Sequence, residues 1–492
     1  MNIAAFTITK YKQMNQAAKA TAWYTICNIM QRGISFLVVP IYLRMLTTSE
    51  YGRYSVFQSW KEILMIFATL NLHCGVFTKA MVDYPKDRDR YTSCMQTLST
   101  ALTMVMLVIY LPASSFWNRR LDMDTITVLM MIAYFIFYPA FLFWSTHQRV
   151  IYKYKQMVVV TLFVSILTPV LSIVFLKCTN FRENAVIWGY LLVQIAAGVF
   201  FYVYNYAKGK CIYDKDYWLH ALKFNIPLIP HYLSLIALSQ IDRIMIKEMC
   251  GDDKAGIYSF TVSISATMNI FISAINSAVV PWTYSQLREE KYKSISKVSN
   301  GLVIMIGIMT AGVMMIAPEI VGFLGTEEYM EAIWVIPAVT FAIYFTFVYG
   351  MFANIEFYYC ATQFVTVATS VAAMANVLSN ALLIPVFGYI AAGYTTLGCY
   401  ILLAVMHYIF SRKICREVIG CNSVYDVKSI VLVSGLMTVA MLICIVLYSN
   451  TVLRYVTFFV AMVMIVMYRR KMISIIKQIV YRSAHDPSPD SP

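Results

Sequence analysis

The chain has few charged residues and no long polar segment. Asp, Glu, Lys and Arg together make up 13% of its 492 residues, whereas hydrophobic residues make up 60%. The mean hydropathy of +0.65 lies outside the range of ordinary soluble domains. The longest connectors between apolar stretches have about fifteen residues, which is too few for a folded domain. We therefore expect this protein to act within a membrane or at its two faces.

Two further features are missing, and one motif that is present is predicted to have no catalytic role. The eleven cysteines form no Cys-x-x-Cys pair, which favours small buried residues in a reducing compartment and predicts no metal or cofactor. The first sixteen residues have no apolar core and no cleavage site, so the first span is predicted to serve as an uncleaved insertion signal. Asp122-Met123-Asp124 has the form of a glycosyltransferase metal motif, but it is predicted to be a solvated turn beside Arg119 and Arg120.

Long apolar stretches dominate what is present. A helix needs roughly 20 apolar residues to cross a hydrocarbon core of about 30 Å, and fourteen stretches meet this length. We place spans near 21–43, 54–76, 93–113, 126–147, 157–177, 185–206, 222–246, 257–280, 299–323, 332–355, 363–386, 389–411, 427–448 and 452–468. The sequence therefore predicts an all-α integral membrane protein with about 14 transmembrane helices.

The basic residues are distributed unevenly between the two faces. The tails and every second connector hold 27 of the 39 Lys and Arg residues, and the opposite face holds 9. The acidic residues divide equally between the faces. Because the positive-inside rule concerns basic residues alone, this pattern predicts a multi-pass protein of the cytoplasmic membrane with both termini in the cytoplasm. The net charge of +14 is then an orientation signal that favours anionic lipid, and nucleic acid is not an expected partner.

Two weak repeats link the halves of the chain. Gly52, Tyr54 and Ser55 recur as Gly256, Tyr258 and Ser259, and the 156–172 segment resembles 363–379 at nearly the same offset. Both matches join a span to the sixth span after it, so the two halves are predicted to enter the membrane from the same side and to enclose a central cavity. The predicted organisation is a cytoplasmic N-terminal segment 1–20, a six-helix half 21–207, a cytoplasmic connector 208–221, a second six-helix half 222–412, helices 13 and 14 in 413–468, and a cytoplasmic tail 469–492.

Short motifs along the chain carry a family resemblance. They are, in order, Gln31-Arg32-Gly33, Glu50-Tyr51-Gly52, Pro227-x-x-Pro230-His231, Gln240-Ile241-Asp242-Arg243, Pro281-Trp282, Ala317-Pro318-Glu319, and Asn376 with Asn380 and Pro385-x-x-Gly388. Over about residues 21 to 470 the chain resembles the bacterial polysaccharide transporters, the Wzx-type O-antigen and capsule flippases of the MATE-like MOP superfamily. The resemblance implies a transporter and not an enzyme.

The resemblance also implies a substrate and partners. The expected cargo is an undecaprenyl-pyrophosphate-linked oligosaccharide (an O-antigen, capsule or exopolysaccharide repeat unit), moved from the cytoplasmic to the periplasmic leaflet of the bacterial inner membrane. Membrane lipid is a partner by necessity. A proton or Na⁺ is a candidate coupling ion, and a polysaccharide polymerase or glycosyltransferases are candidate protein partners.

Arg32 is the leading candidate for contact with an anionic head group. It lies about 11 residues into the first span, roughly 16 Å deep at 1.5 Å per residue, where a cation is costly unless it serves a pathway or an ion pair. Asn28 is one turn away on the same face, and Gln31 is adjacent. The alternative is a buried ion pair between Arg32 and Glu62 or Asp242.

Other polar residues within spans are weaker candidates. Lys61 and Arg243 are further candidate cavity cations, and a structural ion pair is as compatible with their positions. Asp242, Glu62, His231 and Glu356 are candidates for ion coupling or gating. In the eighth span a polar stripe recurs at helical spacing and can line a cavity or join helices, at Asn269, Ser273 and Asn276.

Two rival function classes stay open at this point. A membrane polysaccharide polymerase or glycosyltransferase needs a large outer loop or a metal-binding carboxylate motif, and every outward connector here is short. A multidrug exporter, or an exporter of another lipid-linked precursor, of the same superfamily is the closer alternative. Exporters of cationic drugs favour carboxylates in the cavity, whereas the charges near mid-membrane here lean basic.

Overall fold

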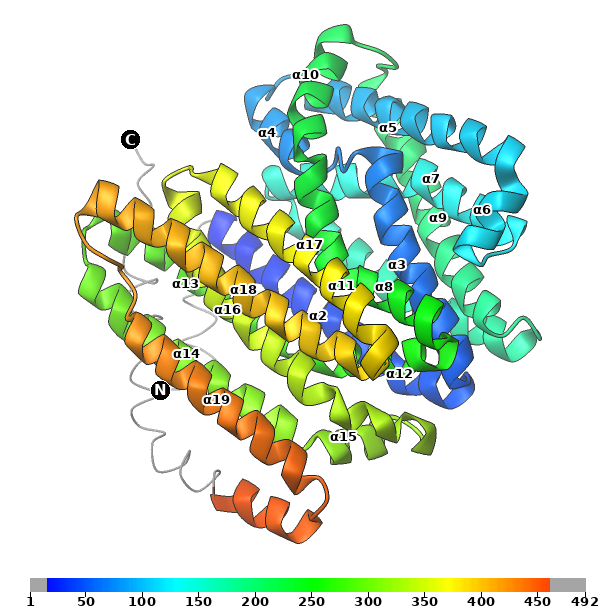
Figure 1. The fold of residues 1–492 in the computed structure, drawn as a ribbon. Coiled ribbons are helices and arrows are strands. Elements are labelled where there is room, and N and C mark those ends of the chain that lie inside the picture. The colour runs from blue at the N-terminus through cyan, green and yellow to red at the C-terminus, as the bar shows by residue number, and fades with distance from the viewer. Residues whose placement is uncertain (1–15, 461–492) are drawn as a thin grey trace, which may run out of the picture. The chain divides into compact units, whose positions relative to one another are not determined.

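The computed structural model describes residues 16–460, and all regular elements in this range are helices (Figure 1). The predicted N-terminal segment, the last part of the fourteenth span and the cytoplasmic tail therefore lie wholly or partly outside the described residues. Twelve helical segments in the described range are long and apolar enough to cross a membrane. The prediction of an all-α, multi-span membrane protein is confirmed.

Two of the expected spans are not among these twelve. The 54–76 stretch corresponds to α3 (Thr48–Thr69), a continuous helix whose charged residues Glu50, Arg53, Lys61 and Glu62 lower its hydropathy. The 452–468 stretch is described only as the short helix Thr451–Val460. The expected span 257–280 is a pair of helices, α12 and α13, that meet at Ala266 and Thr267.

The chain divides into two compact units, Met1–Val38 with Glu50–Gln240 and Val39–Ser49 with Ile241–Pro492. Helices α2 and α11 each contribute residues to both units. The first unit contains most of α2 (Gln16–Met45), α3, α4 (Gly75–Asp83), α5 (Arg88–Tyr110), η1 (Leu111–Ala113), α6 (Ser114–Leu121), α7 (Thr125–Val150), α8 (Tyr154–Cys178), α9 (Glu183–Gly209), α10 (Lys215–Asn225), η2 (Ile226–Leu228) and the start of α11 (Ile229–Cys250).

The core of the first unit is built around α9, which packs against α5, α7 and α8. Two glycines allow the close approach. A Cβ at Gly198 would lie 2.5 Å from the backbone carbon of Phe137 on α7, and one at Gly189 would lie 2.5 Å from Cα of Ser172 on α8. Small residues at such crossings let membrane helices pack through van der Waals contact, because lipid offers no hydrophobic driving force.

The second unit is built around α16. It contains the end of α11, α12 (Asp252–Ser265), α13 (Met268–Arg288), α14 (Tyr292–Met315), α15 (Ala317–Leu324), η3 (Glu327–Trp334), α16 (Ile336–Tyr358), α17 (Thr362–Phe387), α18 (Ile390–Ile414), the π-helical turn η4 (Cys415–Ile419) and α19 (Val427–Leu447). In the most apolar stretch of α16, 83% of the residues are buried. This helix packs against α18, α14 and α12. The predicted thirteenth span, α19, lies along α14 and α16 (Figure 1).

Local polar contacts explain several helix starts and the rim of the first unit. Asp124 accepts a hydrogen bond from the backbone N–H of Thr127 and caps α7, so the Asp-x-Asp sequence is a helix corner. At the starts of α3 and α9, the Arg182 Nε–Glu50 Oε1 and Arg53 Nε–Glu183 Oε1 ion pairs are each 2.7 Å long. The pair with Arg182 gives Glu50 of the Glu-Tyr-Gly motif a structural role.

Candidate functional site

Arg32 lies on the exposed side of α2. The opposite side of the helix is packed through Cys27, which is completely buried in a cluster with residues of α7, α8 and α9. Asn28 and Arg32, one turn apart, are both exposed, whereas Gln31 donates a hydrogen bond to Ser165 Oγ of α8 at 3.0 Å. The face predicted from the sequence thus contains Arg32 and Asn28, and Gln31 belongs to the packing contact.

The Arg32 side chain has no hydrogen bond or ion pair within the described part of the first unit, which includes Glu62. It lies roughly 24 Å from one end of α2 and 20 Å from the other at 1.5 Å per residue. A cation at that depth is costly in lipid, so this face is suited to a water-containing cavity. The guanidinium has five N–H donors in a planar fork that matches phosphate oxygens.

Lys61 is enclosed within the first unit. Its side chain is 4% exposed, and Nζ donates to the Tyr190 hydroxyl at 2.7 Å and lies 3.3 Å from Glu62 Oε1. The ammonium also lies over two rings, 4.4 Å from the centroid of Tyr190 and 5.6 Å from that of Tyr134. We call Tyr134, Tyr190 and Glu62 the Lys61 cage. Contact between Lys61 and a substrate would require this cage to open.

Asp242 is the centre of a polar network inside the second unit. Its side chain is buried and accepts three hydrogen bonds: from the Tyr258 hydroxyl at 2.6 Å, from Thr396 Oγ1 at 2.6 Å and from Asn380 Nδ2 at 2.7 Å. These donors come from α12, α18 and α17, so the carboxylate of α11 joins four helices. The sequence pointed to Asp242 itself, and to Asn380 only as part of a motif. The hydrogen bonds that Asp242 accepts from Asn380 and Thr396 could not be predicted, because these partners lie 138 and 154 positions away in the sequence.

Further hydrogen bonds extend the Asp242 network. Asn376 lies one turn from Asn380 on α17, and both are completely buried. Asn380 Nδ2 donates to Asn376 Oδ1 at 3.4 Å, and Thr395 Oγ1 donates to Asn380 Oδ1. Carboxylate, amide and hydroxyl oxygens are ligands for hard cations such as Na⁺, and a carboxylate can also hold a proton. No group of three or more His, Cys, Asp and Glu residues in the described range can hold a metal ion.

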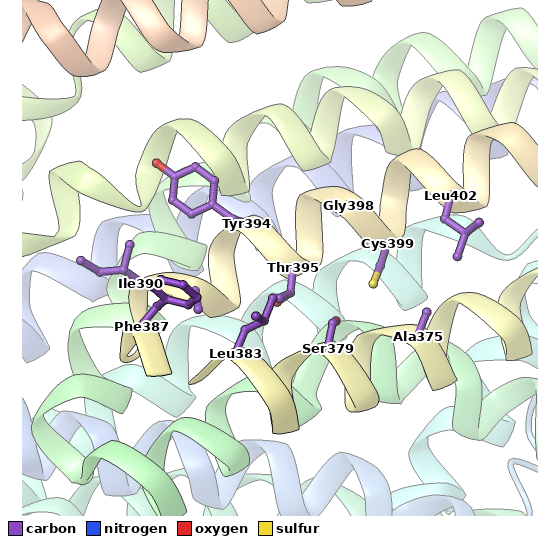
Figure 2. Close-up of a pocket in the computed structure, with 11 residues that line it drawn as sticks. Ala375, Ser379, Leu383, Phe387, Ile390, Tyr394, Thr395, Gly398, Cys399 and Leu402 are labelled. Carbon is purple, nitrogen blue, oxygen red and sulfur yellow. The ribbon is translucent and has the colours of Figure 1, made fainter. Parts of the chain in front are cut away.

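A pocket between α17 and α18 reaches this network (Figure 2). Its volume is about 540 Å³. Ser379 of α17 and Thr395 and Cys399 of α18 line it, and Leu383 and Phe387 contribute apolar surface. Thr395, which lines the pocket, donates a hydrogen bond to Asn380, and Asn380 donates one to Asp242. The side chain of Asn380 thus connects the pocket lining to the Asp242 carboxylate.

Glu356 and His407 form a second buried polar centre in the second unit. Both side chains are 0% exposed, and His407 Nδ1 on α18 is hydrogen-bonded to Glu356 Oε1 on α16 at 2.9 Å. Their other polar atoms, Glu356 Oε2 and His407 Nε2, have no hydrogen-bond partner among the described residues. Glu356 was predicted from the sequence and His407 was not, because nothing in the sequence pattern distinguishes a lone histidine within a span.

The remaining predicted residues are partly buried. His231 lies in the first unit and Arg243 in the second, and both interact with other residues. Asn269, Ser273 and Asn276 lie along one side of α13, where Ser273 Oγ donates to the Asn269 carbonyl at 2.6 Å. This polar stripe stays a predicted cavity lining.

Comparisons with known proteins identify the family. The family model described as "Polysaccharide biosynthesis protein" matches residues 17–288, more than half of the chain. A segment of 72 residues is 33% identical to "Lsg locus putative protein 1" of Haemophilus influenzae, of which it spans 18%. The chain therefore belongs to the polysaccharide biosynthesis protein family, and the predicted resemblance is confirmed.

Solved structures agree on the fold. The lipid II flippase MurJ in an inward closed conformation is similar with a TM-score of 0.66 at 11% identity, over 91% of this chain and 99% of that one. An inward-facing multidrug resistance MATE family transporter of the MOP superfamily is similar with a TM-score of 0.63 at 13% identity, over 80% of this chain and 96% of that one. At these identities the likeness concerns the fold alone.

Proposed function

We propose that this member of the polysaccharide biosynthesis protein family is a flippase. It moves an undecaprenyl-pyrophosphate-linked oligosaccharide from the cytoplasmic to the periplasmic leaflet of a bacterial inner membrane by alternating access. The observation that carries the proposal is the guanidinium of Arg32, which lies at mid-helix on an exposed face and has no partner in its unit.

The chemistry of the cargo matches that face. An isoprenoid diphosphate carries negative charge and a bulky head rich in hydroxyl groups, on a tail too long to be enclosed. The head requires a polar path with cations, and the tail stays in lipid. Arg32 offers paired N–H donors to the phosphate oxygens, and Asn28 offers amide groups to phosphate or sugar.

Other predicted residues have supporting roles in this proposal. Arg243 and the polar stripe of α13 (Asn269, Ser273 and Asn276) add contacts from the second unit. Lys61 contributes positive charge from within its cage, and direct contact would follow only if the bond to Tyr190 breaks.

The second unit supplies the candidates for ion coupling. The Asp242 network offers oxygen atoms around one buried carboxylate, and its amides and hydroxyls can rotate from donating hydrogen bonds to coordinating a cation. Glu356 and His407 offer a separate pair for proton binding. His231 stays a coupling candidate in the first unit. In this proposal Na⁺ or a proton binds within the second unit, while Arg32 of the first unit holds the diphosphate.

Substitution of Arg32 tests the flippase proposal. In a strain that lacks its own flippase and displays surface glycan only when complemented, Arg32→Ala is expected to lower glycan display by at least about tenfold. A hydrogen bond to a charged group contributes roughly 1.5 to 3 kcal/mol. Arg32→Lys is expected to keep partial activity, because lysine retains the charge and loses the planar fork.

Arg44→Ala is the matched control, since Arg44 lies on the same helix and donates to the Phe323 carbonyl. It is expected to retain glycan display, with protein levels compared by immunoblot. Full display with Arg32→Ala at normal protein levels would remove Arg32 from the mechanism.

A multidrug exporter is the second candidate function. The fold likeness to a MATE transporter and the buried carboxylate Asp242 favour it. Expression in a pump-deficient strain distinguishes the two candidates. Reduced accumulation of a cationic dye, lost with Asp242→Asn and kept with Arg32→Ala, would support the exporter over the flippase.

A further inference from the structure

A second cavity of the second unit lies where α18 leads through η4 and a short loop into α19. Its volume is about 770 Å³. We call it the α18–α19 pocket, and the residues that matter here are Tyr408, Arg412, Asp426, Lys428, Val431 and Leu432. Neither the Asp242 network nor the Glu356–His407 pair contributes a residue to it.

The cations of this pocket are unpaired. Arg412 Nε is buried and has no hydrogen-bond partner, and neither the Arg412 guanidinium nor the Lys428 ammonium has an ion pair in the described part of the second unit. The neighbouring basic residues Arg416 and Lys413 do have partners. Arg416 Nε donates to Asn422 Oδ1 at 2.9 Å, and Lys413 lies over the Phe364 ring. The two unpaired basic groups therefore line the cavity.

The one carboxylate of the pocket is already engaged. Asp426 accepts hydrogen bonds from Ser429 Oγ at 2.8 Å, from the Ser429 N–H at 3.2 Å and from Asn300 Nδ2 at 3.1 Å. These hydrogen bonds hold the pKa of Asp426 below its usual range, so it remains charged and caps α19. It forms no ion pair with Arg412 or Lys428, and the pocket retains an excess of positive charge.

Apolar surface continues from the cations along α19. Val431 and Leu432, in the second turn of that helix, line the pocket, and each is 65% exposed. On a membrane helix such residues face hydrocarbon. The pocket thus presents a cationic end and an apolar wall, and an inorganic anion would use only the first.

We propose that the α18–α19 pocket binds an anionic glycerophospholipid, with its phosphate between Arg412 and Lys428 and an acyl chain along Val431 and Leu432. The basic connectors place this end of α19 at the cytoplasmic face, whose leaflet is rich in anionic lipid. The bound lipid holds α19 against α14 and α16 from the outside. This site is separate from cargo binding and does not depend on the proposed transport activity.

Lipid retention by the purified full-length protein tests the site. Native mass spectrometry in detergent would compare phosphatidylglycerol with phosphatidylcholine of the same chain length. The wild type is expected to retain one phosphatidylglycerol preferentially. The double variant Arg412→Gln/Lys428→Gln is expected to bind it about 25-fold more weakly, or about fivefold per cation, as a Lys or Arg near an anionic bilayer surface contributes.

The matched control is Lys413→Gln/Lys208→Gln. It removes the same charge from the same predicted membrane face, but both lysines lie over aromatic rings and neither lines the pocket. Retention like the wild type supports a built site, whereas an equal loss in both double variants would show only diffuse attraction and overturn the proposal. Arg412→Lys, expected to restore most of the retention, controls for misfolding of the glutamine variant.

Two further arms distinguish the source of the phosphate. Excess inorganic phosphate is expected to leave the bound phosphatidylglycerol in place, and displacement would overturn the lipid assignment in favour of a free anion. Undecaprenyl diphosphate is expected to compete poorly. If it displaces phosphatidylglycerol at equal concentration, the pocket belongs to the cargo path and the proposal fails, whatever the outcome for Arg32.

Discussion

Lys61 in the first unit and Asp242 in the second are both buried charged residues, and they are stabilised in different ways. In the first unit the ammonium of Lys61 is held by one phenol, the faces of two rings and one carboxylate. In the second unit the carboxylate of Asp242 is held by hydroxyl and amide groups of three helices. A ring face can only attract a cation, whereas hydroxyl and amide groups can turn and offer oxygen instead. The Lys61 cage therefore suits a permanent charge, and the Asp242 network suits a site whose occupancy changes.

The two units also differ at Tyr54 and Tyr258, the tyrosines that the predicted repeat matches. Tyr258 donates to the Asp242 carboxylate at 2.6 Å, whereas the hydroxyl of its counterpart Tyr54 accepts a hydrogen bond from Gln58 Nε2 at 2.9 Å. The two matched tyrosines thus lie in different electrostatic environments.

The largest effect is expected at Asp242. Asp242→Asn removes the charge while preserving the size of the side chain, and glycan display in the complementation assay is expected to fall to the level of the empty vector. Charged hydrogen bonds of roughly 1.5 to 3 kcal/mol each would be lost at three donors. Normal display with the asparagine variant would show that the charge of Asp242 has no part in transport.

The tyrosine pair gives the next largest effect. Tyr258→Phe deletes one donor to Asp242 and is expected to reduce display by about tenfold, as expected for one hydrogen bond to a charged group. Tyr54→Phe, the matched change in the first unit, is expected to stay within about fivefold of the wild type because the hydrogen bond from Gln58 is neutral and contributes about 1 kcal/mol. Equal losses in both variants would contradict the contrast between the units.

A smaller effect is expected when the Lys61 cage is emptied. Lys61→Met removes a phenol hydrogen bond and a cation–π contact of about 1 to 2 kcal/mol, but it also relieves the desolvation of a buried charge. The melting temperature in detergent is therefore expected to fall by less than about 5 °C, with most of the glycan display retained. A loss of display as complete as that of Asp242→Asn would instead place Lys61 in direct contact with the cargo.

The smallest effect is expected at the rim of the second unit. Lys254 Nζ donates to Glu331 Oε2 at 2.5 Å, and this bond, with one from the Tyr389 hydroxyl, lowers the pKa of Glu331. Because the pKa is lowered in the folded state, the added stability is present above the unfolded-state pKa of about 4.3 and is lost as the pH falls through the folded-state pKa. The melting temperature of the wild type should thus decline slightly more than that of Glu331→Gln between pH 6 and pH 3.5. Identical declines would show that this bond contributes nothing to stability.

The class of protein, its helical spans and its family were available from the sequence. Hydropathy and the positions of Lys and Arg are local properties that add up along the chain, so they identify spans without knowledge of packing. At α3 the charged residues Lys61 and Glu62 lower the hydropathy of the helix, although Lys61 is enclosed by Tyr134 and Tyr190.

Only the tertiary structure decided which charges have partners. Arg32, Lys61 and Asp242 look alike in the sequence as single charges within apolar stretches, but the first is exposed and the other two are buried. The hydrogen bonds that make the difference join residues 129 to 154 positions apart for Lys61–Tyr190, Asp242–Asn380 and Asp242–Thr396. Glu356 likewise meets His407, 51 positions away. Such contacts depend on the rotation of each helix about its axis and on which helices become neighbours, and packing between helices sets both.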